Sequence, residues 1–253
     1  MPRGQSRRVP SADAAALGEP SYVWRFGQER RLGLIRRYVP LEGRRVLDVG
    51  CGIGTYVRRF LDFTPHAYGI DVSHRRLVEA GLGKLVAGEG ERLPFADDSF
   101  DVIVFNEVIE HVRDDRQTLR DALRVVRPGG HVVIYAPNRL YPFETHGIYL
   151  GDRYRFGNIP LVNYLPMRVR NRFVPHARAY SHRAMRRLVS GLPARVVVHT
   201  YVYPGFDNVV ARRPRLGRFL RAVLYRAERT PARRLGLSHF VVLQRPGPGS
   251  PPP

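Results

Sequence analysis

Three glycines at alternate positions, Gly50, Gly52 and Gly54, follow a short apolar segment that is interrupted only by Asp48. The apolar residues predict a buried strand, and the residues after the glycines predict the start of a helix. Glycine is needed where the backbone takes a positive φ or where a ligand approaches it closely. We therefore expect this turn to hold a small molecule against bare peptide groups.

The glycine spacing departs from that of a dinucleotide-binding turn. Such turns have the pattern G-x-G-x-x-G and place a pyrophosphate at the helix N-terminus. Gly50 and Gly52 match its first two positions, but Thr55 occupies the third. The sequence G-x-x-x-x-G-K-[ST] is absent, which excludes a P-loop. The glycines alone are also compatible with an ordinary tight turn, so the surrounding residues decide their role.

A second acid, Asp71, ends another short apolar segment 17 residues after Gly54 (71 − 54). This is close to the spacing of about 20 residues expected for a carboxylate that binds ribose hydroxyls. The alternative is that Asp71 only caps a helix that begins near Ser73. The spacing favours the ribose role.

Four segments, in order along the chain, share a wider pattern. They read VLDVGCGIG at 46–54, YGIDVS at 68–73, ERLPFADDSFDVI at 91–103 and LRVVRPGGHVVI at 123–134. Together they resemble the class I S-adenosylmethionine-dependent methyltransferases, in particular type 11-like members and quinone-pathway O-methyltransferases. The resemblance implies an α/β, Rossmann-like fold whose seven-stranded sheet is mostly parallel with an antiparallel last strand, with helices on both faces and an inserted lid. It also implies S-adenosylmethionine as the cofactor.

The groups of that cofactor suggest where each part binds. Asp48, beside the glycine turn, suits the cationic methionine end, directly or through water. In the family an acid before the Leu-Pro-Phe segment receives the adenine amino group; by position this is Glu89, beside the backbone of Gly90, although Glu91 competes for the role. The expected cofactor-binding residues are Asp48, Gly50, Cys51, Gly52, Gly54, Asp71, Val72, Glu89, Gly90 and Asn106.

The segment 106–111 has two interpretations. On a helix, Glu107, Glu110 and His111 would share one face and could hold a divalent metal, and the stretch resembles metal-assisted small-RNA 2′-O-methyltransferases and quinone-pathway O-methyltransferases. The further ligand would come from His146, His176 or His182. Alternatively, Asn106 caps the helix and the two glutamates interact with its dipole. We predict the second arrangement and no metal.

Two histidines, His111 and His146, are candidates for general-base catalysis. Methyl transfer to a hydroxyl benefits from a base, and neutral imidazole suits pH 7. His146 lies near Glu144 in residues 138–180, which are rich in aromatic residues, proline and arginine and have no long periodicity. Long insertions of this kind often form lids, so we expect the acceptor between 106–111 and 138–180.

The remaining elements position these residues. Helical spacing predicts helices over 22–38, 181–192 and 214–229. The last of these is amphipathic, and we expect it to pack on the sheet or on a second subunit. The alternative is that it docks on an anionic membrane. The expected domain is 21–245, preceded by a mobile arm at 1–20 and followed by a disordered tail at 246–253. The predicted strands span about 45–49, 67–71, 84–87, 101–105, 131–136, 195–203 and 238–245.

The composition bears on the location of the protein and on the kind of partner it binds. The single cysteine, Cys51, excludes an internal disulfide and, with no apolar run long enough for a membrane span, favours a cytoplasmic protein. In the glycine loop, Cys51 is best explained as a small residue that fits a crowded turn. The net charge is +20, but Lys84 is the only lysine and the arginines are spread along the chain, so a nucleic-acid partner is not favoured.

These observations predict an S-adenosylmethionine-dependent methyltransferase that methylates an oxygen of a small molecule such as a quinone precursor, a sugar or a secondary metabolite. The alternatives are an RNA methyltransferase and a cofactor-binding interaction module without activity. The oligomeric state is left open.

Overall fold

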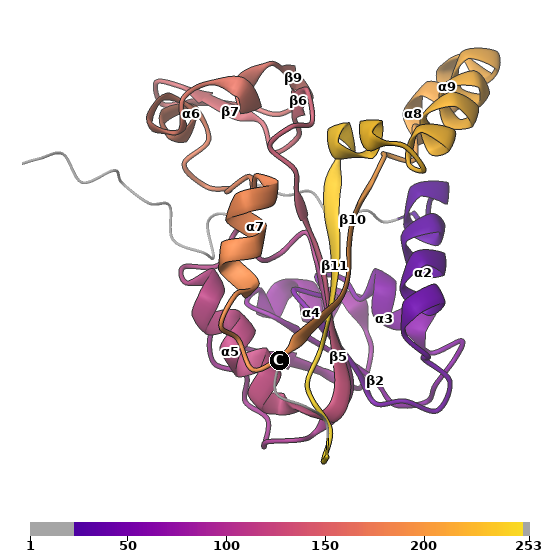
Figure 1. The fold of residues 1–253 in the computed structure, drawn as a ribbon, viewed down its shortest axis with the longest axis vertical. Coiled ribbons are helices and arrows are strands. Elements are labelled where there is room, and N and C mark those ends of the chain that lie inside the picture. Colours follow the sequence, from indigo (N-terminus) through magenta and orange to yellow (C-terminus); the bar gives the residue numbers. More distant parts are fainter. Residues whose placement is uncertain (1–22, 250–253) are drawn as a thin grey trace, which may run out of the picture.

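The centre of the molecule is a seven-stranded sheet in the order β10-β11-β5-β4-β1-β2-β3 (Figure 1). The computed structural model describes residues 23–249. Neighbouring strands are parallel except where β11 pairs with β5 and with β10. The predicted α/β fold, with an antiparallel last strand, is confirmed. The strands are β1 (Val46–Val49), β2 (Ala67–Asp71), β3 (Leu85–Ala87), β4 (Phe100–Asn106), β5 (Val126–Pro137), β10 (Arg195–Val202) and β11 (Ser238–Gln244).

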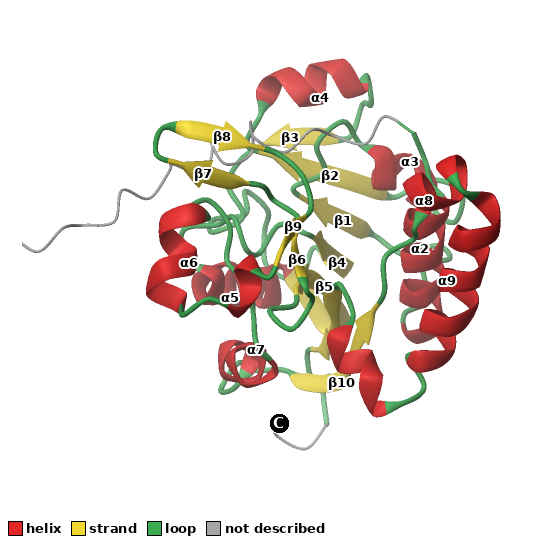
Figure 2. Cartoon of the chain, turned by 90° about the horizontal axis from the view of Figure 1, so that it is seen from above, coloured by secondary structure: helices red, strands yellow, loops and turns green. Residues whose placement is uncertain are grey.

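Helices cover both faces of this sheet, so its central strands are apolar on both sides (Figure 1). Along β4, Val102 and Val104 belong to one hydrophobic cluster, with α2 and α3, whereas Ile103 and Phe105 belong to the other, with α5 and α7. A short helix, α4, lies beside the β3 edge (Figure 2). The helices of these layers are α2 (Phe26–Tyr38), α3 (Thr55–Phe60), α4 (His74–Ala80), α5 (Asp115–Val125) and α7 (His182–Val189).

Residues 138–180, the predicted lid, form short elements beyond the end of β5 (Figure 1). The apolar side chains of Ile148, Val162, Val174 and Ala177 give this segment a small hydrophobic core of its own. The absence of a long period in the sequence is explained by the shortness of each element. These are β6 (Phe143–Glu144), β7 (Ile148–Leu150), β8 (Arg153–Arg155), β9 (Ile159–Pro160), the 3-10 helix η1 (Val162–Tyr164) and α6 (Met167–Phe173).

The amphipathic helix predicted over 214–229 is present, but it does not pack on the sheet as we expected. This helix, α9 (Pro214–Ala227), packs on α8 (Asp207–Arg212) and on the 3-10 helix η2 (Pro231–Leu235), away from the sheet (Figure 1). The contact with α8 is close at Gly217, whose missing side chain leaves room for Val210.

Three further expectations concern the ends of the chain and membranes. The arm at 1–20 lies outside the described residues, and of the tail only 246–249 are described, in irregular backbone. Within residues 23–249, no helix combines the length and apolar character that crossing a bilayer requires.

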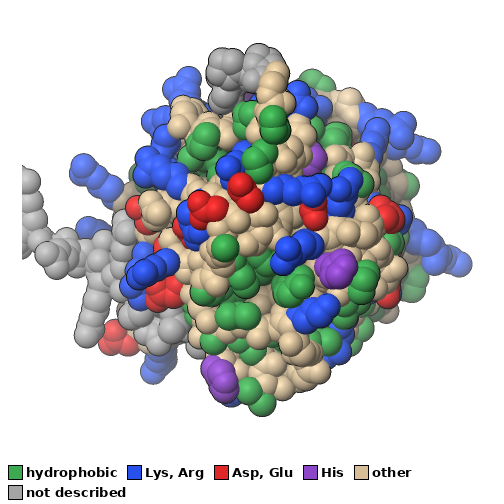
Figure 3. All heavy atoms as spheres, turned by 90° about the horizontal axis from the view of Figure 1, so that it is seen from below, with side chains coloured by type: hydrophobic (Ala, Val, Ile, Leu, Met, Phe, Trp, Pro, Cys, Tyr) green, Lys and Arg blue, Asp and Glu red, His purple; other side chains and the backbone are tan. Residues whose placement is uncertain are grey.

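Seen from below, basic side chains are scattered among acidic and apolar ones rather than gathered in a single patch (Figure 3).

Candidate active site

A cleft opens at the carboxyl ends of β1, β2 and β4, where open α/β sheets bind their ligands. Its volume is about 750 Å³, including its opening to solvent. Four of the predicted cofactor residues, Gly50, Asp71, Val72 and Gly90, line it. The complete lining is Val49, Gly50, Ile70, Asp71, Val72, Arg76, Gly88, Gly90, Glu91, Glu107, Val108, His111 and Val112.

The glycine turn forms one wall of the cleft and has the conformation that its residues predict. Gly50, Gly52 and Gly54 all have a positive φ, of 71°, 55° and 73°. A Cβ atom on Gly50 would lie 2.4 Å from a methyl carbon of Val108. Any side chain at position 50 would therefore be strained and would collide with the opposite wall. Cys51 is buried behind this turn, and burial raises the pKa of its thiol, in agreement with a packing role.

Asp71 is fixed at the end of β2 by two backbone donors. One carboxylate oxygen accepts from the Gly52 N–H at 2.8 Å and the other from the Ser73 N–H at 2.8 Å. The side chain that caps α4 is that of Ser73, which accepts from the Arg76 N–H. Because a carboxylate has about four acceptor positions, Asp71 keeps capacity for two ribose hydroxyls in the cleft.

Asp48 and Glu89, the other two acids that the sequence assigns to the cofactor, do not line the cleft. Asp48 is buried in β1 and does not line the cleft; burial, together with the charge of Asp71, raises the pKa of Asp48 well above its usual value. Its role at the methionine end stays a prediction. Glu89 has a half-exposed side chain paired with Arg113, whereas Glu91 lines the cleft and accepts from the Arg113 N–H at 2.6 Å. The geometry therefore favours Glu91 at the adenine end, beside Gly90.

The segment 106–111 is a turn, so the predicted helix with Asn106 as its cap is wrong. Asn106 is the last residue of β4, and Glu107 has a positive φ of 58°. Arg31 of α2 donates to Asn106 Oδ1 and to Glu107 Oε1, both at 2.7 Å, and Ser238 donates to Glu107 Oε1 at 2.5 Å. Although burial alone would raise the pKa of Glu107, the Arg31 guanidinium and the Ser238 hydroxyl hold it below its usual value. The next helix starts only at Asp115.

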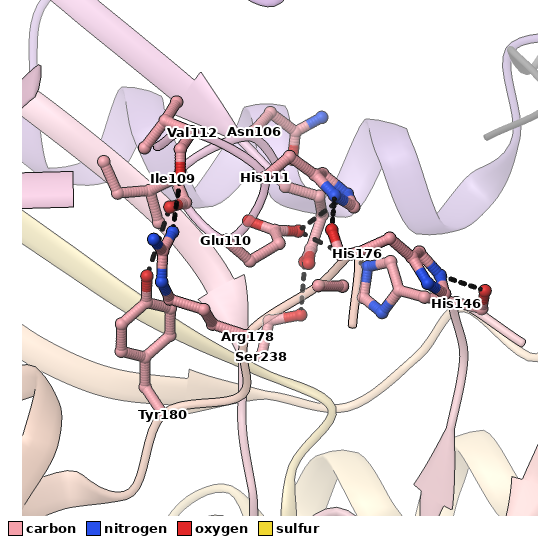
Figure 4. A network of polar contacts seen from close by, with 12 residues as sticks. Asn106, Ile109, Glu110, His111, Val112, His146, His176, Arg178, Tyr180 and Ser238 are labelled. Atoms are coloured by element: carbon pink, nitrogen blue, oxygen red, sulfur yellow. Dashed lines mark hydrogen bonds and ion pairs between the residues drawn. The ribbon is translucent and has the colours of Figure 1, made fainter. Parts of the chain in front are cut away.

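The end of the lid holds this turn in place (Figure 4). Arg178 donates to the carbonyl oxygens of Val112 and Arg113, at 2.5 and 2.7 Å. The Tyr180 hydroxyl donates to the Ile109 carbonyl at 3.1 Å. Lid and turn are therefore one polar assembly, and they meet at Glu110, His111 and His146.

These three residues form a compact cluster at the base of the lid (Figure 4). His146 Nε2 lies 3.4 Å and His111 Nε2 lies 3.8 Å from Glu110 Oε1. Each histidine uses Nδ1 elsewhere: His146 bonds Glu144 Oε1 and His111 bonds the His176 carbonyl, both at 2.9 Å. Within the described part of the chain, the buried carboxylate of Glu110 makes no hydrogen bond of normal geometry. The Nε2 atoms of His146 and His111 both face this carboxylate.

The charges of the two histidines differ, which the sequence did not predict. Burial and the neighbouring His146 lower the pKa of His111 to about 4, so its imidazole is neutral at pH 7. Burial alone would lower the pKa of His146 as well, but Glu110 and Glu144 raise it to about 10. The raised pKa favours a cationic His146 at pH 7, and its role as the base stays a prediction. Burial raises the pKa of Glu110 toward neutrality.

The raised pKa of His146 predicts how stability depends on pH. A group with a higher pKa in the folded chain stabilises it fully below the unfolded value, about 6.5, and this contribution is lost as the pH rises toward 10. We expect the stability difference between the chain and His146→Gln to be largest near pH 6 and to shrink by pH 9.5. Urea unfolding at both values measures it, and a difference that stays constant or grows would contradict a cationic His146.

Glu110, His111 and His146 could together hold a metal ion, although the helix face of Glu107, Glu110 and His111 that the sequence suggested does not form. Glu107 is engaged by Arg31 and Ser238, and the donors that do lie together, within 4.8 Å, belong to Glu110, His111 and His146. Anchored Nδ1 atoms are usual in metal-binding histidines. This geometry is compatible with a metal, and the absence of a metal stays our prediction.

Known proteins resemble the part of the chain that contains the cleft. Residues 47–134 match the model of a methyltransferase domain. An uncharacterised methyltransferase of Mycobacterium leprae is 37% identical over 113 residues, 42% of each chain. A ubiquinone biosynthesis O-methyltransferase of Ralstonia nicotianae is 38% identical over 111 residues, 40% of this chain and 47% of the relative. The chain spans about half the length of the curated relatives it matches.

Solved structures share the fold over more of the chain. An S-adenosylmethionine-dependent methyltransferase from Mesorhizobium loti superposes with a TM-score of 0.59 and 19% identity, covering 84% of this chain and 96% of that one. An S-adenosylmethionine-dependent methyltransferase from Aquifex aeolicus superposes with a TM-score of 0.54 and 16% identity, covering 93% of this chain and 98% of that one. Family and fold together imply S-adenosylmethionine as the cofactor. Residues 47–134 thus match a methyltransferase domain, and the chain shares the fold of solved S-adenosylmethionine-dependent methyltransferases.

Proposed function

We propose that this chain transfers a methyl group from S-adenosylmethionine to an oxygen of a small molecule. The observation that carries the proposal is Asp71, a carboxylate held in the cleft by two backbone donors at the position where the family binds ribose. The names of the quinone-pathway relatives support oxygen as the acceptor atom. The residues 138–180, which form short elements beyond the end of β5 (Figure 1), support a small acceptor that a lid can cover.

The residues of the chain have separate tasks in this account. Bound S-adenosylmethionine supplies an electrophilic methyl group on its sulfonium. The glycine turn admits the ligand, Asp71 accepts the ribose hydroxyls and Glu91 lies at the adenine end. Most of the rate enhancement comes from aligning donor and acceptor. We assign His111, neutral and lining the cleft, to accept a hydrogen bond from the acceptor hydroxyl.

Glu110 is the final proton acceptor in this proposal: His111 Nε2 takes the proton of the acceptor hydroxyl as the oxygen attacks the methyl group, and Glu110 Oε1 then takes that proton from the imidazolium. His111 is a weak base because its pKa is low, whereas the pKa of Glu110 is raised and its carboxylate lies 3.8 Å from His111 Nε2. A base is most effective when its pKa lies near the working pH. His146 stays positively charged beside Glu110 and fixes its orientation.

This assignment predicts the effect of Glu110→Gln, a substitution that keeps the shape of the side chain. We expect turnover to fall by roughly 10²-fold or more, the usual contribution of a general base. Cofactor affinity, measured by calorimetry, should stay within about two-fold because Glu110 does not line the cleft. The control is Glu79→Gln, an exposed acid on α4.

Chelation separates this role from metal binding, which would also require Glu110. We expect full activity of the unaltered chain after exhaustive chelation, and no gain from added magnesium or zinc. Activity that disappears on chelation and returns with one divalent ion would assign the cluster to a metal. Full activity of Glu110→Gln would remove Glu110 from catalysis under either account.

The function itself is tested with a radiolabelled methyl donor and a cell extract. We expect the purified chain to label small molecules that remain after nuclease and protease digestion, and NMR of the product to show the methyl group on oxygen. Label that disappears on ribonuclease digestion would establish the RNA methyltransferase instead. Cofactor binding with no labelled product would favour the interaction module.

A further inference from the structure

Helix α9 carries apolar residues on the face that packs on the protein and also on an adjacent face that is exposed. The inward face holds Gly217 against Val210 of α8. The outward face carries an apolar stripe, Leu216, Phe219 and Val223, whose exposed fractions are 43%, 63% and 45%. We call these three residues the outer stripe. Exposed apolar residues at helical spacing mark a surface that binds something, because folding alone does not require them.

The surroundings of the outer stripe are strongly basic. Residues 207–234 contain nine arginines and only two acids, Asp207 and Glu228. Both acids are already paired within the protein, Asp207 with Arg221 at 3.0 Å and Glu228 with Arg30. The exposed arginines beside the stripe are Arg215, Arg218 and Arg226. No acid among residues 23–249 forms an ion pair with these three arginines, so their charges face solvent.

The position of α9 relates this surface to the cleft. Helices α8 and α9 stand at the end of the molecule where the lid elements β6 to β9 and α6 also rise (Figure 1). Seen from above, β7, β8 and α6 lie on one side of the strand ends and α9 on the other, with β6 and β9 between them (Figure 2). An extended surface that met α9 would therefore lie at the same end of the molecule as the cleft and its lid.

We propose that the outer stripe and its arginines dock on an anionic lipid surface. An interfacial helix of this kind has arginines that meet lipid phosphates and apolar side chains that enter the acyl boundary. A second copy of the chain fits less well, because a symmetric contact through α9 would bring two arginine-rich surfaces together. Nucleic acid would meet the arginines but would leave the aliphatic Leu216 and Val223 without a function.

The test is co-sedimentation of the full chain with vesicles. We expect strong binding to vesicles of phosphatidylglycerol and phosphatidylcholine and at least ten-fold weaker binding to phosphatidylcholine alone. The double variant Arg215→Glu/Arg218→Glu should lower the affinity at least ten-fold. Phe219→Ser should lower it about five-fold or more, and this loss should persist at high salt because it is not electrostatic.

A matched control changes the same charge elsewhere. Arg183 and Arg187 are exposed on α7, so Arg183→Glu/Arg187→Glu should bind vesicles as the unaltered chain does. Equal losses in both double variants would assign binding to net charge and overturn the proposal. So would unaltered binding by Phe219→Ser, no binding to anionic vesicles, or RNA binding that Arg215→Glu/Arg218→Glu abolishes while vesicles stay unbound. Vesicle binding needs no methyl acceptor, so it can fail or succeed independently of the proposed function.

Discussion

Arg170→Ala is expected to destabilise the lid by about 3–5 kcal/mol, the usual result of removing one partner from a buried ion pair. Arg170 is fully buried on α6 and donates to Glu144 Oε2 at 2.6 Å, Asn163 Oδ1 at 3.1 Å and the Ala177 carbonyl at 2.9 Å. Its removal would leave Glu144 Oε2 and two other buried oxygens without this donor, while Glu144 Oε1 keeps its bonds from His146.

The measurement is limited proteolysis with hydrogen exchange over residues 138–180. In the Arg170→Ala variant we expect cleavage and fast exchange in the lid while the sheet stays protected. Arg172→Ala, an exposed arginine on the same helix, is the control and should behave as the unaltered chain. Lid protection equal to that of Arg172→Ala would show that the buried pair does not hold the lid.

Asp71→Ala is expected to weaken S-adenosylmethionine binding by about 1.5–3 kcal/mol, the range for hydrogen bonds to a charged group. This corresponds to roughly 10- to 150-fold in affinity. The physical reason is the loss of the acceptor for the ribose hydroxyls, together with the loss of the acceptor for the Gly52 and Ser73 N–H groups. Adenosylhomocysteine should lose a similar factor, because it carries the same ribose.

Calorimetric titration of both ligands measures this loss, and cooperative thermal unfolding confirms that the variant is folded. Asp97→Ala, an exposed acid remote from the cleft lining, serves as the control. An unchanged affinity in folded Asp71→Ala would remove Asp71 from the cofactor site and with it the observation on which the proposed function rests.

The features that the sequence predicts correctly depend on short stretches of chain. The strand ranges follow from apolar runs, and the positive φ of Gly50, Gly52 and Gly54 follows from residue type. The place of Asp71 follows from the rule that parallel strands end at one edge of the sheet. Each of these inferences needs only neighbours in sequence, so a single sequence is sufficient.

The features that the sequence predicts incorrectly or does not predict depend on distant residues. Asn106 and Glu107 have good helix-start chemistry, but Arg31 and Ser238 occupy their side chains and hold a turn. The charge of His146 depends on two carboxylates, one on another segment, that no local pattern brings together. Likewise α9 packs on α8, where Gly217 leaves room for Val210. Non-local contacts decided each of these outcomes.

The identity of the cofactor is the central claim, and titration calorimetry of the unaltered chain tests it most directly. We expect S-adenosylmethionine and adenosylhomocysteine each to bind one molecule per chain, saturably and in competition with one another, while NAD gives no heat of binding. The glycine turn lacks the third glycine of the dinucleotide pattern, since Thr55 stands in its place. Binding of NAD that adenosylhomocysteine does not displace, or no binding of either methionine-derived ligand, would contradict the account.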